Sequence, residues 1–337
     1  MKKLTWMMLC LGAWGLAACG DDADGDDDDN DDDGSDADSD GDSDGDGDGD
    51  TDADSDADAD GDTDADADGD ADATVCERWN ADRADLGEGT WTGAVGTCDA
   101  GDVTGNGRAN ALKLVNLYRW LADLPPVTNN AGRDAMGQEC ALMMHANGQL
   151  SHSPPTSWTC YSSDGASAAG NSNIASTPGV AGVDLYMVDP GNPTTIGHRR
   201  WILSNSLGPV GLGSTDSYSC LWVLSGSGSA GAQYTAWPSP GVFPVEAIAP
   251  TGWSSVDETG WTVQSDSIGL SGAQVAVTAN SVDKPVQVTS LSSGYGSQYA
   301  IRFTPVGWTT QAGTTYHVEV TGISPAITYD VEVVSCQ

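Results

Sequence analysis

One stretch of this chain has a composition that cannot form part of a folded core. Residues 20–74 hold 29 of the 50 acidic residues, all of them Asp, separated mainly by Gly, Ala, Ser and Thr. The stretch has no large apolar side chain to bury, so we expect a disordered tether that is extended by its own charge repulsion. A folded structure is therefore confined to residues 75–337, a length that suits one large domain or two smaller ones.

The charge of the chain limits its partners. Asp-x-Asp-x-Asp-Gly strings in the tether resemble the start of an EF-hand loop, but the tether has no Glu to close such a loop, so we expect only weak and diffuse cation binding. The formal net charge is −38, and residues 75–337 still carry 10 − 21 = −11. This sign repels phosphate, and we therefore exclude nucleic acid as a partner.

The N-terminus has the pattern of an export signal. Two lysines precede an apolar run over residues 4–16, which is long enough for a signal peptide and short for a membrane span. The run closes on Leu16-Ala17-Ala18-Cys19, the form of a bacterial lipobox. We expect residues 1–18 to be a lipoprotein signal peptide and Cys19 to carry the lipid. The protein would then be anchored in the bacterial cell envelope, at the outer membrane or the cell surface.

The cysteine count agrees with export. After removal of the signal and lipidation of Cys19, six cysteines remain, and an even number outside the cytoplasm indicates disulfides. Six cysteines allow 15 pairings, so the sequence does not fix the connectivity. Neighbourhood along the chain suggests three bridges: Cys76–Cys98, Cys140–Cys160 and Cys220–Cys336.

The folded part begins with a disulfide-tied lead-in over residues 75–107, followed by helical patterns. Apolar residues at helical spacing predict one helix over 109–123 and another over 131–147, and we expect a short third helix over 180–188. Residues 209–213 and 218–224 have the pattern of strands.

The sequence changes character at residue 237. Apolar and polar residues then alternate in five short runs separated by turn residues, as at Tyr316, Val318 and Val320. We expect a linker that starts at Trp237-Pro238 and a C-terminal β-sandwich domain over residues 237–337.

Three blocks, taken in order, resemble a known family. They are Leu114-Val115-Asn116-Leu117-Tyr118-Arg119, the block Gly148-Gln149-Leu150-Ser151-His152-Ser153, and Gly197-His198-Arg199-Arg200-Trp201-Ile202-Leu203. Together they are similar to the CAP superfamily, also called SCP, which includes cysteine-rich secretory, antigen 5 and pathogenesis-related proteins. The resemblance implies a CAP domain over 108–236. The expected fold class is α+β: a three-layer α-β-α sandwich followed by an all-β Ig-like sandwich.

The resemblance also implies a cleft that often holds a divalent metal between two His and two acidic residues. His152 and His198 match the two histidines, and Asp189 best matches one acid, with Asp184 as the fallback. Ser172 stands where the other carboxylate is expected. The candidate zinc ligands are therefore His152, Asp189 and His198. Zinc needs about three or four ligands. Because Ser172 replaces one carboxylate, we expect zinc binding to be weak or absent.

Other polar residues have simpler interpretations. We expect His145 to lie on the surface of the second helix and His317 to face solvent from its strand. Arg199 and Arg200 could attract an anionic ligand, but we expect them to be exposed surface residues.

Two functions remain open. The first is a surface-anchored binding or adhesion module for an extracellular ligand: a small hydrophobic molecule, a polysaccharide or a protein. The second is a metal-assisted hydrolase, a peptidase or esterase, that uses the cleft histidines. We favour the first, because the acidic set is incomplete and residues 75–337 contain no Gly-x-Ser-x-Gly nucleophile motif. We expect a monomer.

Overall fold

The computed structural model describes residues 67–224 and 226–337, which fall within one compact unit. The expected signal peptide, Cys19 and the tether up to residue 66 lie outside the described residues. No helix in the described ranges is long and apolar enough to cross a membrane. Helices dominate the first half and antiparallel strands the second, which confirms the α+β class.

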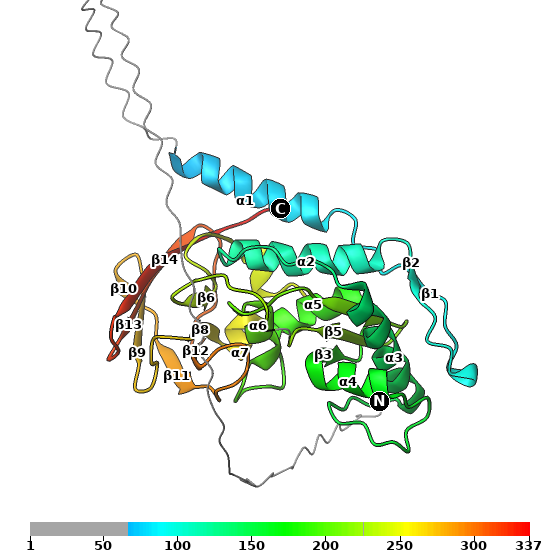
Figure 1. The fold of residues 1–337 in the computed structure, drawn as a ribbon. Coiled ribbons are helices and arrows are strands. Elements are labelled where there is room, and N and C mark those ends of the chain that lie inside the picture. Colours follow the sequence, from blue (N-terminus) through cyan, green and yellow to red (C-terminus); the bar gives the residue numbers. More distant parts are fainter. Residues whose placement is uncertain (1–66, 225) are drawn as a thin grey trace, which may run out of the picture. The chain divides into compact units, whose positions relative to one another are not determined.

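The described chain begins with a helix that the sequence did not predict. Helix α1 covers Ala67–Arg83 (Figure 1), so residues 67–74 are helical rather than tether and the lead-in is not irregular at its start. Its residues have a low intrinsic helix propensity. Tertiary contacts hold it instead, because Trp79 is buried in the main core and Cys76 forms a disulfide with Cys336.

The region that resembles CAP forms three layers around a small antiparallel sheet with strand order β3-β5-β4. Its elements are α2 (Gly107–Leu121), α3 (Ala131–Asn147), α4 (Ser163–Asn171), β3 (Ser172–Ala175), α5 (Gly179–Val188), α6 (Gly197–Ile202), β4 (Gly211–Ser214) and β5 (Ser219–Trp222). The three helices expected from periodicity are confirmed within two residues at each end.

Alternation along the strands explains the layers. In β5, Cys220 belongs to a core cluster with residues of α3 and α4, whereas the next residue, Leu221, belongs to the main core with α2 and α5. The sheet therefore has helices on both faces (Figure 1). Gly213 of β4 is in close contact with α3, since a Cβ there would lie 1.9 Å from the carbonyl carbon of Gly137.

The C-terminal strands form two sheets. One has the order β10-β9-β13-β14-β7 and the other β11-β12-β8-β6. The strands are β6 (Thr235–Trp237), β7 (Gly241–Pro244), β8 (Trp261–Ser265), β9 (Gln274–Ala279), β10 (Val282–Asp283), β11 (Val286–Ser290), β12 (Tyr299–Pro305), β13 (Thr314–Thr321) and β14 (Ile327–Val334). Trp261 of one sheet packs edge-on against Tyr316 of the other, with ring centroids 5.6 Å apart. The remaining short elements are β1 (Thr90–Trp91), β2 (Val103–Thr104), α7 (Val256–Thr259) and two 3-10 turns, Val95–Thr97 and Val245–Ile248.

The helical and strand-rich parts share one main core. Trp237, which is fully buried, packs against Tyr118 of α2 and Phe243 of β7, with ring centroids 5.6 and 4.8 Å apart. Residue 237, where we placed the start of the second domain, is thus the last residue of β6 and part of this core.

The three disulfides differ from the suggested pairing, which is wrong at every bridge. The bonds are Cys76–Cys336, Cys98–Cys160 and Cys140–Cys220. Pairing by sequence neighbourhood failed because packing brings distant segments together: α3 lies on β5, and α1 lies beside the end of the chain.

Candidate functional site

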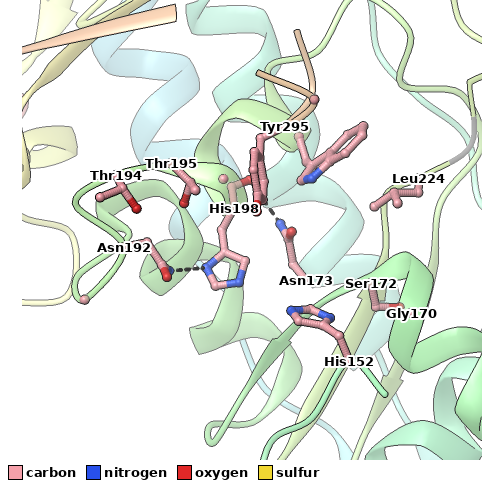
Figure 2. Close-up of a pocket in the computed structure, with 14 residues that line it drawn as sticks. His152, Gly170, Ser172, Asn173, Asn192, Thr194, Thr195, His198, Leu224 and Tyr295 are labelled. Atoms are coloured by element: carbon pink, nitrogen blue, oxygen red, sulfur yellow. Dashed lines mark hydrogen bonds between the residues drawn. The ribbon is translucent and has the colours of Figure 1, made fainter. Parts of the chain in front are cut away.

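The two motif histidines, 46 positions apart in the sequence, meet at one cavity of about 510 Å³. We call it the histidine cavity; its wall includes His152, Ser172, Asn173, His198, Trp201 and Tyr295. Figure 2 shows the rings of His152 and His198 pointing toward each other from different segments. This confirms that both side chains face one site.

Asp189 fixes the orientation of His198. Asp189 directly follows α5, and its backbone has a left-handed conformation with φ of 57°. Its carboxylate accepts two hydrogen bonds from His198. The backbone N–H of His198 lies 2.9 Å from Oδ2, and ring Nδ1 lies 2.9 Å from Oδ1. A carboxylate that accepts from Nδ1–H leaves Nε2 of the neutral imidazole as an acceptor, free to bind a ligand.

His152 is oriented by the backbone. Its Nδ1 lies 2.8 Å from the carbonyl oxygen of Ala169, which can only accept, so Nδ1 carries the proton and Nε2 is an acceptor. Burial lowers the pKa of His152 below its ordinary value of 6.5, and the nearby His198 lowers it further. His152 is therefore a neutral group at pH 7.

Two polar residues of β3 complete this wall. Asn173 donates from Nδ2 to the carbonyl oxygen of His198 at 3.0 Å and joins β3 to α6 (Figure 2). Ser172 is only 3% exposed, and its Oγ has no hydrogen-bond partner among the described residues. A buried hydroxyl without a partner is costly, so a ligand that bonds to it would recover free energy.

The candidate metal ligands are not arranged as the resemblance implied. Asp189 lies behind His198 and does not line the cavity, and Asp184 pairs with Arg83 at 2.7 Å instead. The described residues contain no group of three or more His, Cys, Asp or Glu placed to hold a metal ion. Two imidazoles and neutral oxygen atoms are a poor donor set for zinc, which needs about three or four ligands.

The expectation that Arg199 and Arg200 are exposed is wrong. Both are buried, and burial lowers the pKa of each to about 10, so they remain charged at neutral pH. Arg199 donates to the carbonyl oxygens of Met187 at 2.6 Å and Gly260 at 2.7 Å. Arg200 donates to the carbonyl oxygen of Ser292 at 2.7 Å. The two residues after His198 thus tie α6 to the C-terminal strands.

Tyr295, which the sequence reasoning missed, comes from outside the CAP motifs. It lies in the loop before β12 and against Gly197, where a Cβ would sit 2.8 Å from its ring. The flanking Gly294 and Gly296 have φ of 82° and 72°. The Gly-Tyr-Gly sequence gave only a turn signal, and nothing in it shows that the turn reaches the histidine cavity.

The remaining two histidines lie elsewhere. The expectation of a surface His145 is wrong, because it is half-buried between the rings of Trp91 and Tyr218, with centroids 5.3 and 5.7 Å away. His317 faces solvent as expected, with its side chain 43% exposed, and pairs with Asp330 at 2.6 Å.

Residues 112–224 match the family model named CAP, the cysteine-rich secretory protein family. This part of the chain is similar to that family, and it contains both cavity histidines and Asp189. Tyr295 lies outside the matched residues. No curated protein and no solved structure matches the chain.

Proposed function

We propose that this protein is a binding module that holds an extracellular ligand in the histidine cavity without chemically changing it. The observation that carries the proposal is the state of the two imidazoles. Each has its Nδ1 committed to a fixed acceptor, and each presents Nε2 to a cavity whose size lies within the roughly 300–1,000 Å³ usual for ligand sites.

The arrangement favours binding over catalysis. Nucleophilic catalysis needs a nucleophile within hydrogen-bond reach of a base. Ser172 is the buried hydroxyl of the cavity wall, and it bonds to neither histidine. A metal-assisted reaction is also poorly supported, because Asp189 is turned away from the cavity.

A hydrolase remains the second candidate, on one specific observation. The Asp189–His198 pair has the geometry in which a carboxylate orients a general base, and Ser172 lies in the same cavity. A substrate that moves Ser172 toward Nε2 of His198 would complete a three-residue catalytic arrangement.

Binding and turnover can be separated in one experiment. The ring Cε1–H signals of His152 and His198 are followed by NMR while neutral oligosaccharides, lysophosphatidylcholine and unstructured peptides are titrated in turn. We expect one class to shift both signals while product analysis shows intact ligand. Hydrolysis of a peptide or of p-nitrophenyl esters that is lost in His198→Ala would instead establish the hydrolase.

We also propose that the module is displayed from a membrane. The lipobox ending at Cys19 and the Asp-rich tether support a lipid-anchored lipoprotein in a bacterial envelope, at the outer membrane or cell surface. The six other mature cysteines, which form three disulfides, support an oxidising location.

A further inference from the structure

We propose that the ligand of the histidine cavity is a neutral oligosaccharide, with one sugar ring stacked against Tyr295. This inference rests on the proposed binding function and names its ligand class. A sugar has a rim of hydroxyl groups that both donate and accept, and an apolar face of C–H groups. The cavity offers a match to each of these features.

The first match is in charge. None of the described residues lining the histidine cavity is Asp, Glu, Lys or Arg. Three charged residues next to the lining are buried: Asp189 is 1% exposed, and Arg199 and Arg200 donate to main-chain oxygens. An anionic ligand would find no cation there and would meet a chain of strongly negative net charge. A neutral ligand needs no cation and is not repelled by the negative charge of the chain.

The second match is in hydrogen bonding. Nε2 of His152 and Nε2 of His198 are acceptors, which suit two hydroxyl donors. The unpartnered Oγ of Ser172 can donate to or accept from a third hydroxyl. Asn192 and Thr194 add polar groups at the rim (Figure 2). A lipid chain would leave these groups unpaired, which is penalised in a buried site.

The third match is aromatic. Trp201 and Tyr295 line the cavity, and Tyr295 is 39% exposed, an uncommon state for an aromatic residue in the described chain. Ring faces of this kind stack on apolar groups and leave the Tyr hydroxyl for a polar partner. Figure 2 shows Tyr295 beside His198, so a sugar stacked on the ring would lie within reach of the imidazole.

The position of Tyr295 is preset rather than adjustable. Arg200 holds its loop through the carbonyl oxygens of Ser292 and Ser297, at 2.7 and 3.1 Å. Gly296 packs so closely on Arg200 that a Cβ would lie 2.3 Å from the Arg200 carbonyl oxygen. A ring held in this way loses little freedom on binding, which favours affinity.

A matched pair of tyrosines tests the proposal. Tyr299 is also 39% exposed but lies on β12, outside the histidine cavity. The mature chain and its Tyr295→Ala, Tyr295→Phe and Tyr299→Ala variants are screened on an array of neutral and acidic glycans. Hits are measured by calorimetry with the soluble oligosaccharide, and trigalacturonate serves as the anionic probe. Thermal unfolding verifies that each variant is folded.

We expect binding to at least one neutral glycan that weakens about tenfold or more in Tyr295→Ala, by the loss of a stacking contact. Tyr299→Ala should bind like the natural protein, and Tyr295→Phe, which keeps the ring, should lose less affinity than Tyr295→Ala. Three results overturn the saccharide proposal: no neutral glycan is bound, trigalacturonate is preferred, or Tyr295→Ala binds unchanged. If lysophosphatidylcholine or a peptide instead shifts the His152 and His198 signals, the binding function stands and only the ligand class is wrong.

Discussion

At the residue scale, His152 shows how burial sets the chemistry of the cavity. Because burial lowers its pKa below 6.5, the folded protein takes up this proton less readily than the unfolded chain. The contribution of His152 to the free energy of unfolding is constant above about pH 6.5. It falls as the pH drops below that value toward the pKa of the folded state. The natural protein should therefore lose more stability between pH 7.5 and 5 than His152→Gln. Urea unfolding at several pH values measures the difference, and parallel curves would contradict it.

His317 provides a control of opposite sign. The hydrogen bond to Asp330 raises the pKa of His317 above 6.5, so the folded state binds this proton more readily than the unfolded chain. Its contribution is fully present below pH 6.5 and is lost as the pH rises through the folded pKa. His317→Gln should thus change the pH profile in the opposite direction to His152→Gln, in the same urea measurements.

Arg199 is the second residue whose role follows from burial. Arg199 is 0% exposed, and its guanidinium donates to the carbonyl oxygens of Met187, Val188 and Gly260. Arg199→Met should lower the free energy of unfolding by more than about 3 kcal/mol, since each buried polar group left unpaired costs about 1–3 kcal/mol. Denaturant unfolding gives the value. Arg78→Met, at a site 40% exposed, is the matched control and should change it little.

At the element scale, the sequence predicts what its periodicity encodes. The apolar stripe of α2 and the alternation of Tyr316, Val318 and Val320 in β13 match the buried faces observed. Helix α1 has no such stripe and depends on a disulfide and one buried Trp, contacts that arise only after the chain has folded. The disulfide pairing and the burial of Arg199 could not be predicted for the same reason.

The candidate site was predictable only in part. The histidines occur in recognisable motifs, so their convergence followed from the family resemblance. The direction in which the Asp189 side chain points depends on the left-handed backbone conformation of Asp189 at the end of α5. The amino-acid sequence does not reveal this conformation. Tyr295 enters from a loop about 100 residues further along, through contacts made by Arg200.

The contact between α3 and β4 gives a prediction for a single element. A Cβ at Gly213 would overlap the backbone of Gly137, and neither main chain can move without disturbing the sheet. Gly213→Ala should lower the free energy of unfolding by about 1–3 kcal/mol or more through overpacking, as measured by thermal or urea unfolding. Gly96→Ala adds a methyl with nothing within 4 Å and should be nearly neutral; equal effects of the two changes would disprove the explanation.

At the scale of the whole molecule, the segment similar to CAP and the C-terminal strands form one structure. They share the main core, and the histidine cavity takes walls from both. The histidine cavity therefore depends on residues well beyond the matched segment 112–224. This also explains why the family resemblance, which ends before β6, described the site incompletely.

Attachment to the membrane gives a prediction for the full chain. If Cys19 carries the lipid, as we propose, the natural protein expressed in a bacterial host should incorporate an alkyne-labelled palmitate and remain with the membrane fraction. Cys19→Ser should lose the label and appear in the soluble fraction, whereas Cys10→Ser, within the apolar run, should behave like the natural protein. Label retained in Cys19→Ser would show that the anchor lies elsewhere.

The bond between Cys76 and Cys336 closes a covalent ring around 260 positions of sequence. A protease that cuts one peptide bond inside that ring separates no fragment, because both pieces stay joined through sulfur. If the tether fixes residue 76 to a surface, the nicked protein stays there as well. Shedding would then require either a second cut, a cut before Cys76, or a reductant.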